Sequence, residues 1–213
     1  MSRNFSLDTA AAKEANSGGK RITEPGPYTG KFRAAFYEKN RNGTESVNLI
    51  FVSDGGQEVG PLALYTHNKD GEPLPSYKTL NAILACVRLR GIEGVPGKVS
   101  LYDFDSRGEV TKEKTCYPAL IGSRIGLVLQ GEEYENNQGE IKTRMVVAAP
   151  FEADSRKMAE EVLSKAEQAT ALERYLTWFA DHKVKPLKTA RSAPAQTSQP
   201  ASVVDDFDDA IPF

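Results

Sequence analysis

Basic side chains and aromatic rings are interleaved along several β-rich segments of this chain. Residues 28–41 contain Lys, Arg, Phe and Tyr in close succession, and residues 98–117 repeat the mixture. A cation can neutralise a phosphate and a ring can stack on a base, so a groove with both can bind single-stranded DNA without reading its sequence. The predicted DNA contacts are Lys31, Arg33, Tyr37, Lys39, Arg41, Tyr65, Lys78, Tyr102, Arg107 and Lys112.

The same residues also have a plain structural use. Side chains alternate between the two faces of a strand, so about half of the rings must face a core. Residues 21–150 contain equal numbers of basic and acidic side chains, and the whole chain has a formal net charge of -2. Composition therefore permits a DNA-binding face without locating it.

Residues suited to catalysis are scarce. His67 lies in a turn cluster and His182 in a linker-like segment, and their spacing from the two cysteines matches no zinc site. The segment GVPGKVS, residues 94–100, lacks phosphate-loop spacing, and we interpret it as a turn. We expect no catalytic residue, metal or cofactor, and hence a protein that is not an enzyme.

One enzymatic alternative remains open. The carboxylates of residues 102–109 and 130–140 could hold a divalent metal, as in a phage recombination nuclease. Both segments read as hairpin turns, where acidic side chains usually face solvent.

The two cysteines and the absence of apolar segments bear on location. Cys86 and Cys116 each sit among apolar neighbours without a CxxC motif, which predicts buried free thiols in a reducing compartment. No signal-peptide pattern and no run of 18 apolar residues is found. We expect a cytoplasmic protein with no membrane span.

The order of predicted elements indicates the fold class. Three strands are expected between residues 27 and 66, then a helix through residues 76–90, then further strands in hairpins up to residue 151. Asn, Asp and Gly clusters mark the turns. We predict a mainly β fold, an OB-like Greek-key barrel with one helix between strands 3 and 4.

A second helix is expected from about Ser155 to Asp181. Apolar residues recur there in a near-heptad stripe formed by Met158, Val162, Ala169, Leu172, Leu176 and Phe179. We expect this stripe to pack on the barrel, and the alternative is a coiled coil in a homodimer.

The chain accordingly divides into five predicted segments. They are a mobile N-terminal arm (1–24), the barrel (25–152), the C-terminal helix (153–181), a disordered linker (182–204) and an acidic tip (205–213).

The last nine residues, DDFDDAIPF, place four aspartates before Ile-Pro-Phe. This pattern closely resembles the acidic C-terminal tip of bacterial single-stranded DNA-binding proteins, in which the last Phe enters an apolar pocket on a replication or repair protein. Ala210 replaces the acid usual at that step. The resemblance implies a partner-binding role for Asp205, Asp206, Phe207, Asp208, Asp209, Ile211, Pro212 and Phe213.

The body of the chain carries a second resemblance. The segments YTGKFRAAFYEKNRNGTESVNLIFVSDGGQ, LYTHNKDGEPLPSYKTLNAILACVRLRGI and YPALIGSRIGLVLQGEEY resemble an OB-like family of phage and prophage single-stranded DNA-binding proteins. The implied function is coating of single strands during DNA replication, recombination or repair, with recruitment of partner proteins through the tip. A tip-bearing adaptor without DNA affinity is the remaining alternative.

Overall fold

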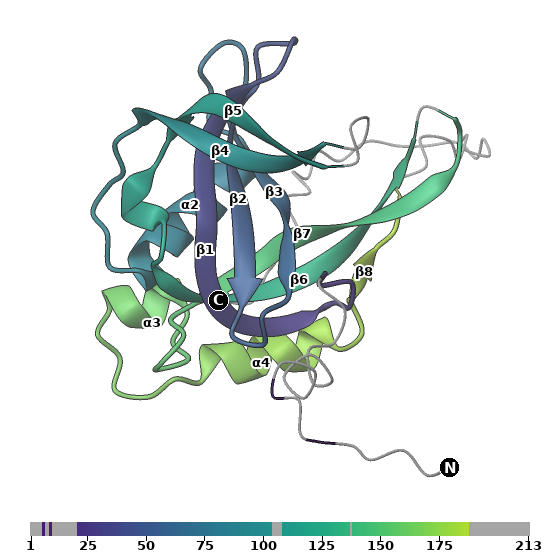
Figure 1. Ribbon diagram of the computed structural model, residues 1–213. Helices are drawn as coiled ribbons and strands as arrows, with labels where there is room; N and C mark the ends of the chain where they lie inside the picture. Colours follow the sequence, from purple (N-terminus) through teal and green to yellow (C-terminus); the bar gives the residue numbers. More distant parts are fainter. Residues whose placement is uncertain (1–5, 7–8, 10–20, 104–107, 137, 188–213) are drawn as a thin grey trace, which may run out of the picture.

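The computed structural model describes residues 21–103, 108–136 and 138–187, together with Ser6 and Thr9. The fold is mainly β (Figure 1). Its elements are β1 (Gly26–Lys39), β2 (Glu45–Ser53), β3 (Glu58–His67), α2 (Pro75–Cys86), β4 (Val95–Asp103), β5 (Gly108–Cys116), η1 (Pro118–Leu120), β6 (Arg124–Glu135), β7 (Ile141–Phe151), α3 (Ala159–Leu163), α4 (Ala171–Phe179) and β8 (Val184–Lys185). The predicted order of three strands, one helix and further hairpin strands is confirmed.

The strands form one open, curled sheet that is antiparallel apart from β8. β2 lies between β3 and β1, and β1 pairs with both β6 and β5. β6 also pairs with β7, while β8 runs parallel to β6. β3 and β7 contact each other across the open side of the sheet. Among the described residues no ladder of hydrogen bonds joins these two strands.

Strand β1 bends sharply and pairs with three strands, β2, β5 and β6 (Figure 1). Gly26 to Lys31 pair with β6, whereas Phe36 pairs with Cys116 of β5. A bulge between Phe32 and Ala34 shifts the register with β2 at the bend. A Cβ atom on Gly30 would lie 2.1 Å from the carbonyl oxygen of Val52, so only glycine allows this close approach.

The inside of the curled sheet holds the main apolar core. Leu49, Phe51 and Leu127 are fully buried there, and Phe32 meets Phe51 edge to face at 6.2 Å. Helix α2 covers one end of this core with Leu80, Ile83 and Cys86. Burial raises the pKa of the Cys86 thiol to about 12, which keeps it neutral. Both cysteines are buried and free, as predicted.

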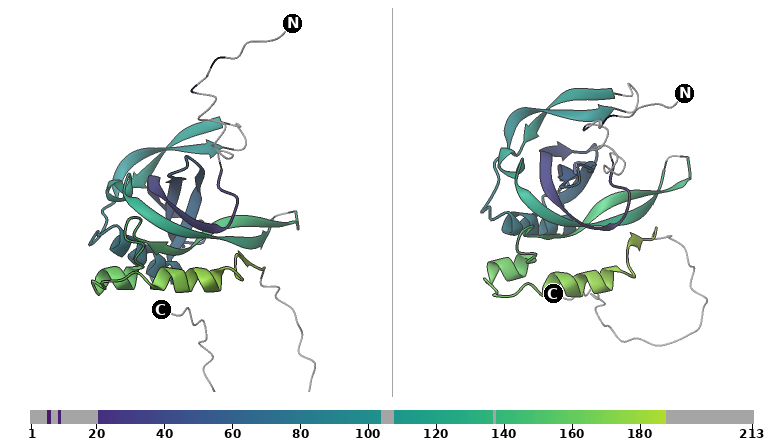
Figure 2. Two further views of the ribbon diagram at one scale, coloured as in Figure 1. Left: turned by 90° about the horizontal axis from the view of Figure 1, so that it is seen from below. Right: turned by 60° about the horizontal axis from the view of Figure 1, so that its bottom comes forward.

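Two smaller cores lie on the outer face of the sheet. The β4–β5 hairpin covers one part, where Val99 and Cys116 pack on Phe36. Helix α4 covers another, where Leu172, Tyr175 and Phe179 pack with Val128, Ala149 and Phe151. The two views in Figure 2 show α3 and α4 along the same side of the sheet, with the β6–β7 hairpin projecting beyond it. Of the predicted stripe, Met158, Leu172, Leu176 and Phe179 thus pack on the strands, whereas Val162 and Ala169 are not part of this core.

Three turns share one hydrogen-bonding scheme: those between β1 and β2, between β3 and α2, and between β6 and β7. Asn40, Asn68 and Asn136 each accept, through the side-chain oxygen, the backbone N–H groups two and four residues further on. The glycine three residues after each asparagine has a φ of 81°, 83° or 79°. A left-handed residue closing a short turn favours glycine, which is why these turns could be predicted from sequence.

Helix α2 ends before its predicted limit at residue 90, and residues 94–100 after it also differ from the prediction. α2 ends at Cys86 because Arg88 takes a left-handed φ of 58° and Leu89 N–H bonds back to Leu84 O. The prediction that residues 94–100 form a turn is wrong, since they lie largely in β4. Pro96 is tolerated there because, in the described part of the chain, β4 lies at the edge of the sheet and pairs with β5 alone.

The predicted single C-terminal helix is also wrong. Residues 153–181 form two short helices, α3 and α4, because Lys165 adopts a left-handed φ of 57° after α3 and the chain restarts as a helix at Ala171. The near-heptad pattern did not reveal this break, after which the backbone N–H groups of Thr170 and Ala171 donate to the Glu161 carboxylate.

Two predicted segment boundaries need correction. Ile22 belongs to the core, with 2% of its surface exposed, and its N–H donates to Glu58 O, so the arm does not extend to residue 24. The linker does not begin at His182, because Val184 and Lys185 form β8. The arm up to residue 20 apart from Ser6 and Thr9, the linker from residue 188 and the tip (residues 205–213) lie outside the described residues.

The close approach at Gly30 leads to a stability prediction. We expect Gly30→Ala to lower the free energy of unfolding by roughly 3 kcal/mol or more, because backbone atoms of β2 cannot move aside cheaply. Gly91→Ala is the matched control, since nothing lies within 4 Å of a Cβ there and the change should stay within about 0.5 kcal/mol. Urea unfolding of both variants measures this, and equal losses would contradict the role of Gly30.

Candidate nucleic-acid interface

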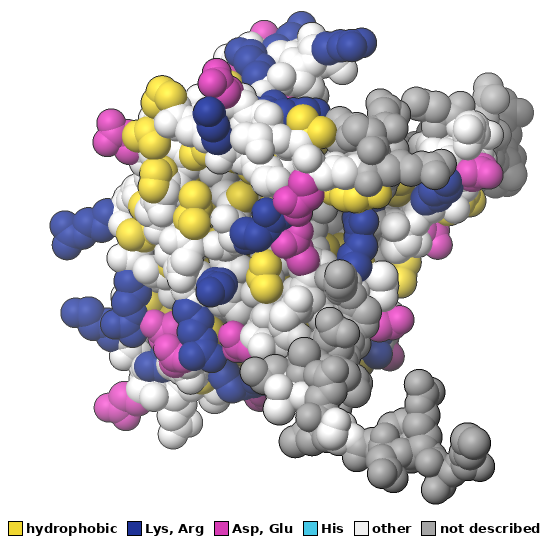
Figure 3. Space-filling model, in the orientation of Figure 1, with side chains coloured by type: hydrophobic (Ala, Val, Ile, Leu, Met, Phe, Trp, Pro, Cys, Tyr) yellow, Lys and Arg dark blue, Asp and Glu magenta, His cyan; other side chains and the backbone are white. Residues whose placement is uncertain are grey.

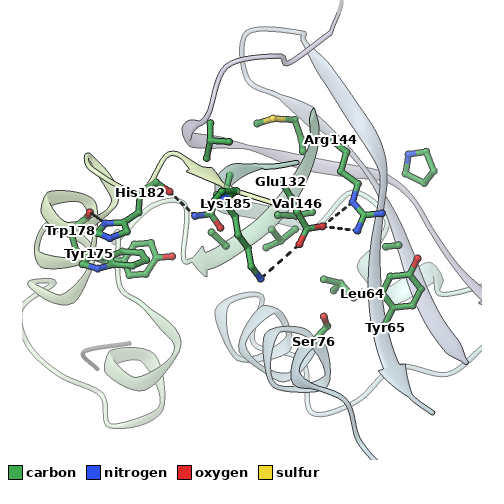
Figure 4. Close-up of a pocket in the computed structure, with 18 residues that line it drawn as sticks. Leu64, Tyr65, Ser76, Glu132, Arg144, Val146, Tyr175, Trp178, His182 and Lys185 are labelled. Carbon is green, nitrogen blue, oxygen red and sulfur yellow. Dashed lines mark hydrogen bonds and ion pairs between the residues drawn. The ribbon is translucent and has the colours of Figure 1, made fainter. Parts of the chain in front are cut away.

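A groove of about 670 Å³ follows β7 along the open side of the sheet. We call it the β7 groove. The residues that define it here come from five elements: Tyr65 of β3, Glu132 of β6, Arg144 of β7, Trp178 of α4 and Lys185 of β8, with His182 between the last two elements. Figure 4 shows Tyr65 on one side of Arg144 and the Trp178 and His182 rings on the far side of Lys185.

Two cations share one carboxylate in the middle of the groove. Arg144 donates from Nε (2.9 Å) and Nη2 (2.6 Å) to Glu132 Oε2, and Lys185 Nζ lies 3.8 Å from Glu132 Oε1. About half of each cationic side chain is exposed, at 51% and 53%, against 24% for Glu132. Both cationic side chains are therefore more exposed than the carboxylate that they share.

Strand alternation places Tyr65 at one end of the groove. Leu62 and Leu64 point into the core, so Tyr65 projects from the outer face of β3 with 39% of its surface exposed. The adjacent β7 contributes Arg144 from across the open side of the sheet. The Tyr65 ring and the Arg144 guanidinium group thereby line the same groove, although β3 and β7 are not paired by hydrogen bonds.

The other end of the groove is built by α4. Trp178 and His182, four residues apart, stack with ring centres 4.2 Å apart and planes at 10°. His182 Nδ1 lies 2.7 Å from Trp178 O, and Gln130 Nε2 donates to His182 O at 2.6 Å. His182 is exposed and lies in the loop between α4 and β8, as expected, but its ring is held against Trp178 and so is not loosely placed.

A single carboxylate fixes where α4 begins. Glu161 accepts backbone N–H groups from Thr170 (2.7 Å), Ala171 (2.9 Å) and Met158 (3.1 Å). It thus sits at the N-termini of both α3 and α4, where a negative charge is favoured. Burial by itself would raise the pKa of Glu161, but these donors together hold that pKa below its ordinary value.

Most predicted DNA contacts lie away from the β7 groove. Of the ten, the structure brings Tyr65 into the groove lining. Lys31 is exposed on β1, Arg41 on the turn after it and Lys78 on α2, while Tyr102 and Lys112 lie on the β4–β5 hairpin. Arg107 lies outside the described residues.

Three other predicted contacts have carboxylate partners. Arg33 Nη2 donates to Glu58 at 2.9 Å across β2. Lys39 donates to Glu45 at 3.3 Å. Burial, with a hydrogen bond to the same Glu45, raises the pKa of Tyr37. Any polyanion would have to compete with these acids.

The groove residues that the sequence did not single out had only weak signals. Strand alternation could have placed Arg144 on the outer face of β7. Trp178 and His182 have the i, i+4 spacing of a helix face. The helix was expected to end at Asp181, however, with a linker from His182 onwards. Lys185 belongs to β8, whose two residues are too few for any strand pattern.

The face shown in Figure 3 carries basic, acidic and hydrophobic side chains side by side, without a continuous basic stripe. Within the described ranges, no group of three or more His, Cys, Asp or Glu side chains is placed to hold a metal ion. None of the helices in the same part of the chain is long and apolar enough to cross a membrane. Comparison with models of known families and with curated proteins finds no match to this chain.

The position of Glu161 leads to a prediction with a pH signature. We expect Glu161→Gln to lower the free energy of unfolding at pH 7 by roughly 1.5–3 kcal/mol, because charge-assisted hydrogen bonds to two helix N-termini are weakened. A carboxyl group with a lowered pKa stabilises the fold above its ordinary pKa of 4.5 and loses this contribution as the pH falls. The difference between variant and parent should therefore shrink as the pH falls below 4.5.

Urea unfolding followed through Trp178 fluorescence measures the effect of this substitution. Glu160→Gln is the control, because Glu160 is exposed on the same helix and should change stability little. Equal effects of the two substitutions, or a difference that persists in acid, would contradict the capping role of Glu161.

Proposed function

We propose that this chain is a sequence-tolerant single-stranded DNA-binding protein without catalytic activity. The observation that carries the proposal is the β7 groove, which combines exposed rings with two half-exposed cations. Every base offers a face for stacking and every nucleotide a phosphate, so such a groove can hold a single strand of any sequence. A duplex hides its base faces and would gain only the electrostatic part.

The order of strands supports an OB-like barrel as the scaffold. β1, β2, β3, β6 and β7 correspond to the five strands of that fold, with α2 between the third and fourth. The β4–β5 hairpin is then an insertion after the helix. In OB-like folds, single strands bind across the strand 2–3 face and between the loops that follow strands 1 and 4, and Tyr65 lies on the matching β3 surface.

The C-terminal tip supports a role in recruiting partners. Asp205 to Phe213 resemble the tips through which bacterial single-stranded DNA-binding proteins contact replication and repair proteins. Four aspartates would steer the tip towards basic surfaces, and Phe213 supplies an apolar anchor. We propose on this basis that the protein coats single strands during phage DNA replication, recombination or repair, in the cytoplasm of a bacterial cell.

The decisive measurement compares fluorescently labelled oligo-dT with a duplex of equal length at two salt concentrations. We expect clear preference for the single strand and a steep loss of affinity as salt rises. Equal affinity for both forms would contradict the proposal. Loss of DNA that depends on a divalent ion would favour the nuclease alternative, and an absence of binding would favour the adaptor.

Tyr65 provides a variant test of the same proposal. We expect Tyr65→Ala to weaken oligo-dT binding by roughly 5- to 100-fold, the range for one stacked base. Tyr65→Phe is the matched control, because it keeps the ring and should retain most of the affinity. Fluorescence anisotropy measures both variants, and a similar loss in the two would indicate that the hydroxyl, rather than stacking, matters.

The shared carboxylate gives a prediction of opposite sign. We expect Glu132→Gln to strengthen oligo-dT binding roughly threefold or more at low salt, because Arg144 and Lys185 lose their competing acid. The gain should shrink at high salt, where charge interactions are screened. Glu173→Gln is the control, since Glu173 pairs with Arg156 outside the groove and changes the net charge equally. Equal gains in both variants would assign the effect to net charge alone.

A further inference from the structure

The ring of Trp178 is not among the α4 side chains that are buried against the sheet. Helix α4 packs on the sheet through Leu172, Tyr175 and Phe179, which have at most 4% of their surface exposed. Trp178 lies beside this row with 37% exposed. Large apolar rings gain most when they are buried, so an exposed tryptophan that lines a groove beside a second ring would gain from being covered by a ligand.

The ring pair is held in a defined position before any ligand arrives. His182 N–H donates to Phe179 O at 2.9 Å, and Gln130 of β6 holds the backbone carbonyl of His182. Tyr175 contacts Trp178 at 5.5 Å from the buried side. Rings fixed in this way lose little conformational freedom on binding, which favours affinity.

The charge around the rings selects the kind of ligand. Lys185, three residues after His182, lies between the ring pair and the Arg144 end of the groove (Figure 4). Its ammonium group is 3.8 Å from Glu132, a weak pairing that a phosphate could replace. Aromatic faces alternating with cations along one groove match the alternating bases and phosphates of a single strand.

We propose that the Trp178–His182 pair is a second base-stacking platform, and that the bound strand runs along the β7 groove from Tyr65 past Arg144 and Lys185 to α4. This inference rests on the proposed function and deepens it, because it gives the ring pair a base-stacking role and gives the bound strand a path along the groove. The occupant is single-stranded DNA, and an apolar peptide segment is the competing occupant.

The experiment uses the full chain and two signals in one titration with labelled oligo-dT. Trp178 is the one tryptophan of the sequence, so its fluorescence reports on this platform alone, whereas anisotropy of the labelled DNA reports total binding. We expect quenching of Trp178 that follows the anisotropy curve. We also expect Trp178→Leu to weaken binding roughly 5- to 100-fold, with Trp178→Phe in between, because stacking declines with ring area.

Controls separate stacking from folding. The melting temperatures of the two variants test whether the fold survives, and Leu163→Ala removes an exposed apolar side chain (72% exposed) outside the groove and should leave the affinity unchanged. If a variant has a lowered melting temperature, quenching of Trp178 fluorescence in the parent protein still tests whether DNA stacks on this ring pair.

The possible outcomes distinguish failure of this inference from failure of the proposed DNA-binding function. DNA binding without Trp178 quenching, and with unchanged affinity of Trp178→Leu, would overturn the second platform and leave the proposed function standing. No DNA binding at all would overturn both. Quenching by an apolar peptide but not by oligo-dT would assign the platform to a protein partner and overturn the inference.

Discussion

The bend in β1 is the constraint on which the rest of the molecule depends. One strand has to pair with β2 on one side and, on the other, with β6 near its start and β5 near its end. The bulge at Phe32 to Ala34 and the bare Cα of Gly30 allow that turn. Because β1 turns, the β6–β7 hairpin comes round to face β3 and the β4–β5 hairpin covers the outer face of β1 and β2. The open side between β3 and β7 is the consequence, and the groove lies there.

Each element contributes only one or two of the side chains that define the β7 groove. β3 contributes a ring, β6 a carboxylate, β7 a guanidinium group, and α4 and β8 a ring pair and an ammonium group. Placing Glu132 between Arg144 and Lys185 lowers the repulsion between two cations in the absence of a polyanion. Such an arrangement agrees with the near-neutral composition of residues 21–150, because the positive charge is local. Glu161 completes the assembly by setting where α4 starts.

The elements that follow from local chemistry could be predicted. Strand order, the helix after β3 and the Asn-Gly turns each depend on residues close in sequence, through alternation, helix spacing and left-handed glycines. Features that depend on distant partners could not be. The break between α3 and α4 needs Glu161 to meet residues nine and ten positions later, and β8 exists only because β6 lies beside it. Likewise, nothing in the local sequence shows that Arg33 is neutralised by Glu58 from two strands away.

The sequence by itself determined a mainly β chain with one helix among its strands and buried free thiols. It also carries a mixture of cations and rings, and a tip whose resemblance is the basis for the partner proposed above. Only the tertiary structure decided which rings and cations share a surface. Tyr65 joined Arg144, Lys185 and Trp178, residues up to 120 positions away along the chain, while other candidates were dispersed. The physical reason is that long-range strand pairing sets which side chains are exposed and which charges are paired. The type and spacing of neighbouring residues do not show that pairing.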